Sequence, residues 1–553
     1  MKNKYYYIYL ISLFFIINST FAQEQNTNNS SQKGSEQNKA QKPNETTNHP
    51  LEFPSMTVEG KEQLKVQSGV KQYPIRVQPL SPAQIDSISP VHKQQALLIP
   101  AKPLISNIIS RNFKNNYLNV FAGNFLTLNA DAGLQHIIDN FTLGLDLHAF
   151  YTDGHIKNAE EFDAGFNFDL SYLAPRKYWI FGGSKVKAFA DLNVDNYNMY
   201  AMDTAFGRKA FDFDFGIKSD GEFQGFQYST GASYDIFNIN HNNDLAENSN
   251  IKGFLSIRKL IDTNIVLLAN GSVRFGTSFG TPNNFINFNG GAQMKFSKFI
   301  IDMLAGVQST GSTDKIQRAN LAIIGNVQYL LNKLFTISAG VNMNFEDYDF
   351  RDSWEINKFI EHKSKLDFPY ERAIKAAINF HPNEITMFSA GLKLSLTDRF
   401  KYFLINDNKI FNIEYADASG FNLFAKGSLL LNKYGDISAE INYRNVSYNN
   451  SNDNSKLLPN IAPFDILLAY NNDWGKKIGT KLEINYIGKR YEDMANQKEV
   501  NGFINLAIKV SYKLLDNLTV YLKGDNLLNQ NRYFWGPYRD RDLFLSVGAL
   551  WQF

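Results

Sequence analysis

Hydrophobic and polar residues alternate over long stretches between residues 117 and 553. In residues 162–172, for example, Phe, Ala, Leu and Tyr occupy the even positions, while Asp, Gly, Asn and Ser occupy the odd ones. Because successive side chains of a β-strand point to opposite faces, such a stretch has one apolar face and one polar face. The same alternation recurs in residues 141–149, 186–194, 211–215, 437–444, 481–486, 504–512 and 518–523. The pattern predicts a chain built mainly of β-strands.

The number and length of these stretches separate two classes of β protein. A soluble sandwich gives the same alternation as a transmembrane barrel, whose apolar face meets lipid. Here about 22 stretches of mostly about 10 to 14 residues follow one another with no helical interlude. Soluble strands average about 5 to 6 residues, whereas membrane-spanning strands need about 9 to 11. We therefore predict an all-β fold: a transmembrane antiparallel β-barrel of about 22 strands over residues 117–553, with a disordered N-terminal arm.

The last stretch, residues 543–553, places Leu, Leu, Val, Ala, Trp and Phe on one face and ends on an aromatic residue. Its pattern of Ser546, Gly548, Trp551 and Phe553 resembles the β-signal that closes bacterial outer-membrane barrels. That resemblance implies recognition by the barrel-assembly machinery during biogenesis. The alternative is the last strand of a soluble sandwich.

The connections between the stretches are of two kinds. Tight turns are predicted at Asp139-Asn140, Lys433-Tyr434-Gly435 and Leu515-Asp516-Asn517, which carry typical turn residues. Longer polar links are predicted near residues 153–160, 237–250, 349–369, 449–463, 491–501 and 528–541. Outer-membrane barrels have short periplasmic turns and long outer loops. If the last strand ends in the periplasm, residues 528–541 face the cell exterior.

The first 22 residues have the features of a signal peptide. Lys2 and Lys4 precede an apolar run from Tyr5 to Ile17, and Thr20-Phe21-Ala22 provides small residues at the cleavage-determining positions. This apolar run is too short for a transmembrane anchor, which would need about 20 apolar residues. We expect cleavage after Ala22 and a location in the outer membrane of a Gram-negative cell.

Two further segments precede the barrel. Residues 23–50 are almost entirely polar and cannot bury enough surface to offset the entropy of ordering, so they are predicted to be disordered. Residues 51–116 carry seven prolines, which interrupt helices and sheet ladders. This proline-rich arm either threads the barrel, forms a periplasmic tether or is a plain linker; it is not a complete plug domain.

Composition removes several classes of chemistry. The net charge is +2, so no strong field favours nucleic acid. The chain has no cysteine, which excludes disulfides, thiolate metal sites, a cysteine nucleophile and a lipid-carrying cysteine. No two of the eight histidines have metal-ligand spacing on one element. We predict neither a cofactor, a metal site nor an enzyme activity.

Near the C-terminus the chain is similar to a known family. Strand Gly502–Lys513, turn Leu514–Asn517, strand Leu518–Leu527 and the run from Asn526 to Tyr533 look like the end of a TonB-dependent receptor barrel. Residues 116–127 are similar to the barrel start of a plug-less relative found in Bacteroidetes-type bacteria. The resemblance implies an outer-membrane barrel related to transport.

The region before the barrel departs from that family, whose members carry a folded plug before the first strand. Only residues 23–116 are available for one here, and they contain no convincing energy-coupling box. We therefore carry over the barrel and not the TonB-driven transport cycle.

One loop combines aromatic and basic residues that could contact a sugar or a protein surface. The candidate contact residues are Arg532, Tyr533, Phe534, Trp535, Tyr538 and Arg539. In the alternative, this loop folds over the barrel mouth and Trp535 is buried by its neighbours. Residues 354–363 are predicted to form a short amphipathic helix in another outer loop.

Two classes of function remain open. In the first, the barrel is a passage whose wet lumen has mixed charge, lined by Asp146, Asp163, Lys187, Glu440, Lys481, Glu483 and Lys509. In the second, it is a subunit of an outer-membrane complex for nutrient capture, secretion or barrel assembly, and its loops or arm bind a protein partner. In both, outer-membrane lipid surrounds the barrel. The main alternative to a transport-related barrel or a complex subunit is a passive porin-like channel for solutes.

Overall fold

The computed structural model describes residues 116–178, 181–383, 386–448, 456–475 and 477–553, all within one compact unit. The predicted signal peptide and the segment 23–50 lie outside the described residues. So does the proline-rich arm, apart from its last residue.

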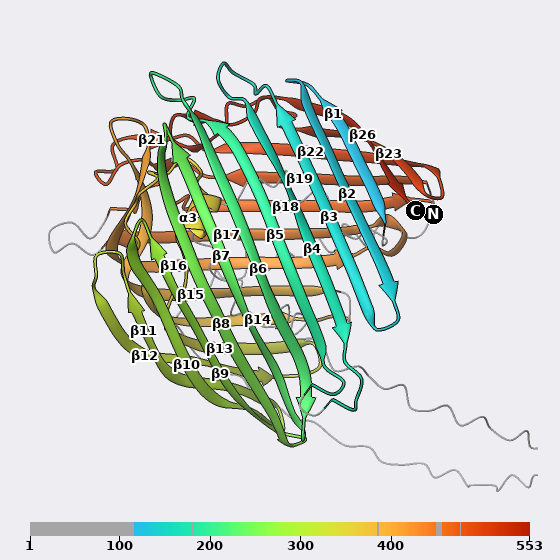
Figure 1. Ribbon diagram of the computed structural model, residues 1–553, viewed down its shortest axis with the longest axis vertical. Coiled ribbons are helices and arrows are strands. Elements are labelled where there is room, and N and C mark those ends of the chain that lie inside the picture. The colour runs from blue at the N-terminus through green and yellow to red at the C-terminus, as the bar shows by residue number, and fades with distance from the viewer. Residues whose placement is uncertain (1–115, 179–180, 384–385, 449–455, 476) are drawn as a thin grey trace, which may run out of the picture. The chain divides into compact units, whose positions relative to one another are not determined.

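Twenty-two antiparallel strands form one closed ring (Figure 1). The strands are β1 (Tyr117–Gly123), β2 (Thr127–Ile138), β3 (Phe141–Thr152), β4 (Glu161–Leu173), β5 (Lys185–Asn198), β6 (Gly207–Phe223), β7 (Phe226–His241), β8 (Asp244–Asp262), β9 (Ile265–Ser278), β10 (Thr281–Phe296), β11 (Phe299–Gly311), β12 (Gln317–Leu330), β13 (Phe335–Phe345), β14 (Tyr370–Phe380), β15 (Met387–Ile405), β16 (Phe411–Leu430), β17 (Asp436–Tyr448), β18 (Phe464–Trp474), β19 (Ile478–Ile487), β22 (Phe503–Leu515), β23 (Leu518–Asp525) and β26 (Phe544–Gln552). β26 pairs with β1, where Tyr117 lies opposite Gln552 and Gly123 lies opposite Ser546. The predicted barrel of about 22 strands is confirmed.

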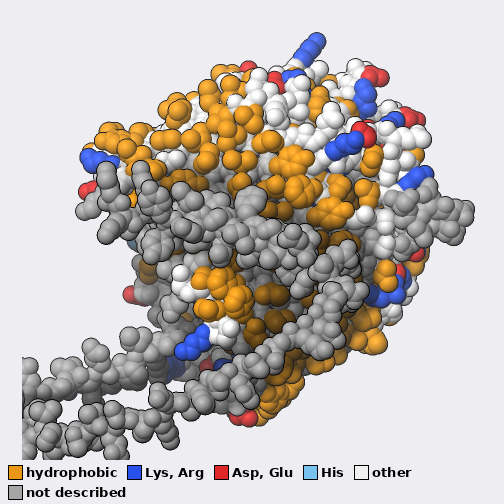
Figure 2. Space-filling model, turned by 180° about the vertical axis from the view of Figure 1, so that it is seen from behind, with side chains coloured by type: hydrophobic (Ala, Val, Ile, Leu, Met, Phe, Trp, Pro, Cys, Tyr) orange, Lys and Arg blue, Asp and Glu red, His pale blue; other side chains and the backbone are white. Residues whose placement is uncertain are grey.

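The apolar face of each strand points away from the ring. In β26, Leu545 and Val547 are 45% and 61% exposed, whereas Ser546 between them is 2% exposed. Strands on other parts of the wall also expose apolar side chains, among them Ile251, Leu321, Ile374 and Leu522. Figure 2 shows hydrophobic side chains covering much of the wall, with charged side chains mostly toward its edges. This is the surface that a lipid-embedded barrel requires.

The two ends of the barrel differ. The end that carries Tyr117 and Gln552, called here the terminal end, has the predicted tight turns at residues 139–140, 431–435 and 516–517. The opposite end, called here the loop end, has the long connections 346–369, 449–463, 488–502 and 526–543. One connection at the terminal end, residues 174–184, is also long.

The long link predicted at residues 237–250 is wrong. β7 continues to His241 and β8 begins at Asp244, so only Asn242 and Asn243 form the turn, both with positive φ. Asparagine adopts this backbone conformation readily in tight hairpins. Residues 237–250 are mostly polar because these strands extend beyond the apolar belt, and a polar stretch of this kind has the composition of a loop.

Few elements lie outside the wall. They are the helix α3 (Phe350–Ile356), the 3₁₀ turn η3 (Asn432–Tyr434), and two small hairpins, β20 (Arg490–Tyr491) with β21 (Glu499–Val500) and β24 (Tyr533–Trp535) with β25 (Tyr538–Arg539). α3 is an exception to the predicted absence of a helical interlude. None of the helices in the described ranges is long and apolar enough to cross a membrane.

Val547→Lys tests which face of β26 meets lipid. A lysine on the lipid face near mid-membrane should destabilise the barrel by about 2–4 kcal/mol. Gln552→Lys, on the inner face of the same strand, is the control and should change stability much less. Urea unfolding of both variants in lipid vesicles measures the difference, and equal losses would contradict the assignment of faces.

Candidate functional site

The connection between β13 and β14, residues 346–369, folds into the barrel and is called here the crossing segment. Its helix α3 lies within the ring of strands (Figure 1). The Asp349 carboxylate accepts a hydrogen bond from the Asp352 backbone N–H, and the Asp352 carboxylate accepts one from the Asp349 N–H. This capping box starts the helix, and the extended backbone of Asn357 ends it.

The helix predicted at residues 354–363 is therefore misplaced, since α3 begins at Phe350 and ends at Ile356. The reason is local. A carboxylate at Asp349 satisfies the first free N–H groups of the helix, so the helix starts directly after it.

One side of the wall holds the start of the crossing segment through ion pairs. The Asp347 carboxylate pairs with Arg274 of β9 at 2.8 Å, and Arg351 pairs with Asp212 of β6 at 3.2 Å. The buried Asp349 carboxylate lies 3.2 Å from the Lys252 ammonium of β8. Charges removed from water need such partners, so these three pairs fix α3 against β6, β8 and β9.

The middle of the crossing segment is held by β4, β5 and β6. The Lys358 ammonium pairs with the Glu161 carboxylate at 2.5 Å, and the Tyr197 hydroxyl donates to the Lys358 carbonyl at 2.7 Å. The fully buried Arg208 guanidinium donates to the carbonyl of Ile360. Polar side chains of the wall thus provide hydrogen bonds for backbone groups of a segment that is not part of a β-sheet.

Ile360 also reaches the opposite wall. It forms a parallel bridge with Phe411 of β16. The Glu361 N–H donates to the Phe411 carbonyl at 2.7 Å, and the Phe411 N–H donates to the Phe359 carbonyl at 3.0 Å. β6 and β16 are ten places apart in the ring of 22 strands, so they lie almost opposite each other. The crossing segment therefore joins opposite walls of the barrel at the loop end.

A second group of charges fixes the crossing segment to the rim. The Asp244 carboxylate at the start of β8 accepts from His362 Nε2 at 2.9 Å and pairs with the Lys363 ammonium at 2.6 Å. The His362 ring stacks on the His241 ring, with centroids 4.5 Å apart and planes 4° apart. Arg208 Nε donates to His241 Nδ1 at 3.0 Å, so the same arginine supports both the rim contact and the Ile360 carbonyl.

The loop predicted to contact a sugar or protein packs onto the crossing segment. The Tyr538 ring stacks on the Phe359 ring with centroids 3.6 Å apart, and the Trp535 ring meets Phe403 and Phe411 edge-on. Trp535 is 7% exposed and Tyr538 is 2% exposed. The structure thus has this loop folded over the mouth.

Of the other four candidate contact residues, Phe534 and Arg532 are buried. The Arg532 guanidinium pairs with Asp525 at 3.0 Å and with Asp540 at 2.7 Å. Tyr533 and Arg539 remain half-buried. A contact between this loop and a sugar or protein stays a prediction.

Three of the four β-signal residues lie in β26 and Phe553 directly follows it, so that the four are divided between the two faces of the strand. Ser546 and Gly548 point inward, and a Cβ at Gly548 would lie 2.4 Å from the Tyr521 ring. Trp551 and Phe553 are exposed on the lipid-facing side, with ring centroids 4.6 Å apart. Glycine is needed at position 548 for close packing, whereas the role of the four residues in assembly stays a prediction.

The seven residues predicted to line the lumen lie opposite the apolar parity of their strands. Asp163 contacts His148 at 3.1 Å, and Lys187 pairs with Asp169 of the neighbouring strand. Both signs of charge therefore meet on the inner wall. Solute passage along it remains a prediction.

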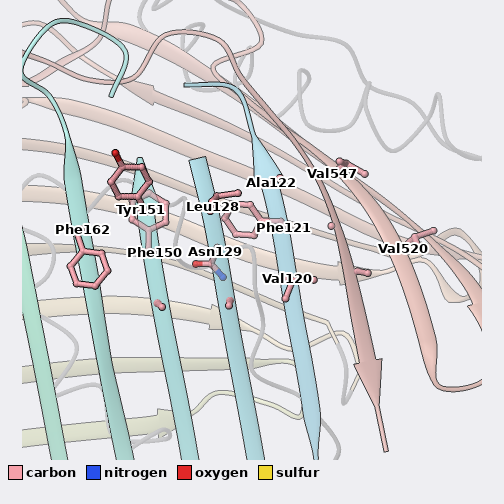
Figure 3. A pocket seen from close by; sticks show the side chains of 14 residues that line it. Val120, Phe121, Ala122, Leu128, Asn129, Phe150, Tyr151, Phe162, Val520 and Val547 are labelled. Atoms are coloured by element: carbon pink, nitrogen blue, oxygen red, sulfur yellow. The ribbon is translucent and has the colours of Figure 1, made fainter. Parts of the chain in front are cut away.

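An apolar groove of about 630 Å³ crosses the closing seam on the outside of the barrel (Figure 3). Its outward side chains include Val120 of β1, Leu128 of β2, Tyr151 of β3 and Val547 of β26, all exposed. Because the groove is on the lipid-facing surface and almost free of polar groups, lipid acyl chains can fill it.

Within the described ranges, no three His, Asp or Glu side chains are grouped so that they could hold a metal ion. The site's main electrostatic feature is instead the capping box. Burial raises the pKa of Asp352 to about 7, and the adjacent Asp349 carboxylate adds to the rise. Although burial opposes it, the Lys252 ammonium with Arg351 and Arg274 holds the pKa of Asp349 below its usual value.

Sequence reasoning missed the anchors of the crossing segment. Their partners are far apart in the chain, such as Asp349 and Lys252, and no local pattern pairs them. One signal was present: residues 346–352 contain four acids and one arginine beside two aromatic residues.

No protein-family model and no curated protein matches the sequence. Solved structures do match. The FrpB iron transporter from Neisseria meningitidis (F3-3 variant) has a TM-score of 0.64 at 9% identity, over 80% of this chain and 82% of that one. A mutant of the ferric enterobactin receptor PfeA from Pseudomonas aeruginosa has a TM-score of 0.60 at 10% identity, over 79% and 80%. The copper transporter OprC has a TM-score of 0.59 at 12% identity, over 80% and 81%.

At these identities the similarity shows the fold alone. The barrel expected from the resemblance to TonB-dependent receptors is confirmed at that level.

Asp349→Ala should release the crossing segment. The change removes the capping box and leaves Lys252 without one of its two carboxylates. Together these two effects should lower the local stability of the crossing segment by about 3 kcal/mol. Trypsin cleavage at Arg351 and Lys358 in folded barrels measures it, and the wild type should resist. Asp516→Ala, which removes an exposed carboxylate, is the matched control and should not be cleaved faster. Equal resistance of all three proteins would contradict the anchoring role.

The stability of the crossing segment should depend on pH through Asp352. Because the closed segment binds this proton more tightly than the open one, its stability should fall as the pH rises from about 3.8 to about 7 and then level off. Asp352→Asn keeps an oxygen acceptor for the Asp349 N–H and removes the charge, so the part of the pH dependence that Asp352 causes should disappear. The buried Glu346 carboxyl of the same segment, whose pKa burial also raises, should keep its own contribution. Hydrogen exchange of residues 346–369, corrected for the intrinsic rate, measures this; an unchanged pH profile in the variant would count against it.

Proposed function

We propose that the chain is a transport-related outer-membrane barrel whose passage is controlled at its outer mouth by the crossing segment. The observation that carries the proposal is the double attachment of Ile360, to Arg208 on one wall and to Phe411 on the other. A segment attached to both walls narrows the lumen. Breaking a limited set of ion pairs would free it.

The outer-membrane location is supported by the closed wall and its lipid-facing apolar surface. In lipid every strand edge must be paired, and the pairing of β26 with β1 leaves none open. Cleavage of a signal peptide after Ala22 completes the proposed route to that membrane. With the tight turns in the periplasm, the loop end faces the cell exterior.

Proteins of similar fold include an iron transporter, a ferric enterobactin receptor and a copper transporter. They support transport as the general process and give no support to an enzyme activity. TonB-driven uptake is not part of the proposal, because residues 23–116 are expected to contain neither an energy-coupling box nor a complete plug.

A passive porin-like channel is the weaker alternative. The polar inner wall would suit such a channel, but a segment that crosses the mouth does not favour an open passage. The subunit hypothesis stays open beside transport, with a protein partner that binds the outer loops or residues 51–116. A partner that displaces the crossing segment would combine the two hypotheses.

Single-channel conductance tests the proposal. The full chain in a planar bilayer should conduct poorly. Replacing residues 350–366 by a short Gly–Ser linker should raise the conductance, and removing residues 51–110 as well should raise it further if the arm fills the lumen. A full chain that conducts as freely as the doubly shortened variant would reject the proposal.

The matched control is a Gly–Ser replacement in the hairpin at residues 497–499, which leaves the crossing segment intact and should change little. Purification from native outer membranes in mild detergent then separates the two hypotheses. A stoichiometric bound protein would support the subunit, and a barrel that is purified alone would support solute passage.

A further inference from the structure

Three lysines form one row across neighbouring strands of the inner wall. In the sheet register Lys481 of β19 lies opposite Lys509 of β22, which lies opposite Lys523 of β23. Exposed Val510 and Leu522 occupy the lipid-facing parity of these strands, so the lysines face the lumen. Lys509 is in the middle of β22, between the loop end and the terminal end.

Like charges placed directly opposite each other destabilise a sheet, because their Cβ atoms are only about 4.5–5.5 Å apart. A row of three repeats this repulsion twice. Such an arrangement needs a counter-charge in the same place, supplied by the wall or by something bound to it.

At three other places in the described wall, two cations also lie directly opposite each other. Carboxylates accompany all three pairs. Lys187 and Lys218 pair with Asp169 and Asp220, Lys252 and Arg274 pair with Asp235, Asp347 and Asp349, and Lys393, opposite Lys375, pairs with Glu371. At each of these places the wall or the crossing segment supplies the counter-charge.

The row differs in this respect. In the described part of the chain neither Lys481 nor Lys509 forms an ion pair with a carboxylate; the Lys509 ammonium lies over the Tyr521 ring, 3.9 Å from its centroid. Two acids are near. Asp525 is already paired with Arg532 at 3.0 Å, and a buried carboxylate oxygen of Glu483, Oε1, has no hydrogen-bond partner among the described residues. Neither acid forms an ion pair with Lys481 or Lys509 within the described residues, and Lys523 has an interaction of its own.

We propose that this row is an oxyanion-binding site in the lumen, which takes the phosphate or carboxylate group of a solute on its way through the barrel. Ammonium groups on flexible stems bind compact oxyanions as point charges, and those of Lys481 and Lys509, which lie opposite each other on neighbouring strands, can approach one such group. The inference rests on the proposed function for its role in passage. The binding itself does not depend on conductance.

Inorganic phosphate is the probe for the test. The thermal unfolding midpoint of the full chain in neutral detergent is measured in phosphate and in chloride at equal ionic strength. Phosphate should raise the midpoint of the wild type. In Lys481→Gln, in Lys509→Gln and in the double variant this shift should be reduced or lost, while the midpoint in chloride should rise because the repulsion is relieved.

Lys187→Gln is the matched control. It removes an inward lysine that already has a carboxylate partner, so it should keep the phosphate shift and should not gain stability in chloride. An equal phosphate shift in all variants would show an adventitious effect and overturn the site. If phosphate raises the unfolding midpoint only after residues 51–110 are removed, the site is also overturned. In that case residues 51–110 supply the counter-charge of the row in the full chain.

The two proposals can fail separately. A phosphate shift that depends on the row, in a barrel that never conducts in any variant, would keep the oxyanion site and reject passage. Conduction through the shortened variants without a phosphate shift would keep passage and reject the site.

Discussion

The pairing of β26 with β1 is the contact on which the rest of the structure depends. Seven residues of each strand join the two ends of a sheet formed by more than four hundred residues of chain. Without it, two strand edges would lie unpaired in lipid, at a cost of several kcal/mol for each unsatisfied backbone group. With it, the inner faces of the strands enclose one space, and polar side chains with no place in lipid can occupy it.

The crossing segment uses that enclosed space. Its acids and its arginine find partners on β6, β8 and β9, and its backbone finds partners on β6 and β16. Buried ion pairs add little net stability, because desolvation opposes the attraction, but loss of one partner is costly. Such pairs therefore favour one position of the segment over others. They also make its release sensitive to a ligand or protein that competes for a few charges.

Much of the wall could be predicted from the sequence, because the alternation of apolar and polar residues is a local property of each strand. The apolar residues of a strand show which of its two faces points toward lipid. The parity of residues 543–553 assigned the exposed Leu545 and Val547 correctly. The same reasoning failed at residues 237–250, where two strands continue beyond the apolar belt and their outward residues turn polar. The mouth could not be predicted, because Asp349 and Lys252 are 97 positions apart and their pairing appears only when the ring is closed.

Disulfide formation between Ile360→Cys and Phe411→Cys tests most directly whether the crossing segment joins the two walls. The chain has no other cysteine, and bridge partners in a sheet lie close enough for a disulfide. If the segment crosses the mouth, oxidation in intact outer membranes should give one intramolecular disulfide and protect both thiols from alkylation. Free alkylation of both cysteines without cross-linking would contradict the crossing and, with it, control of the passage by this segment.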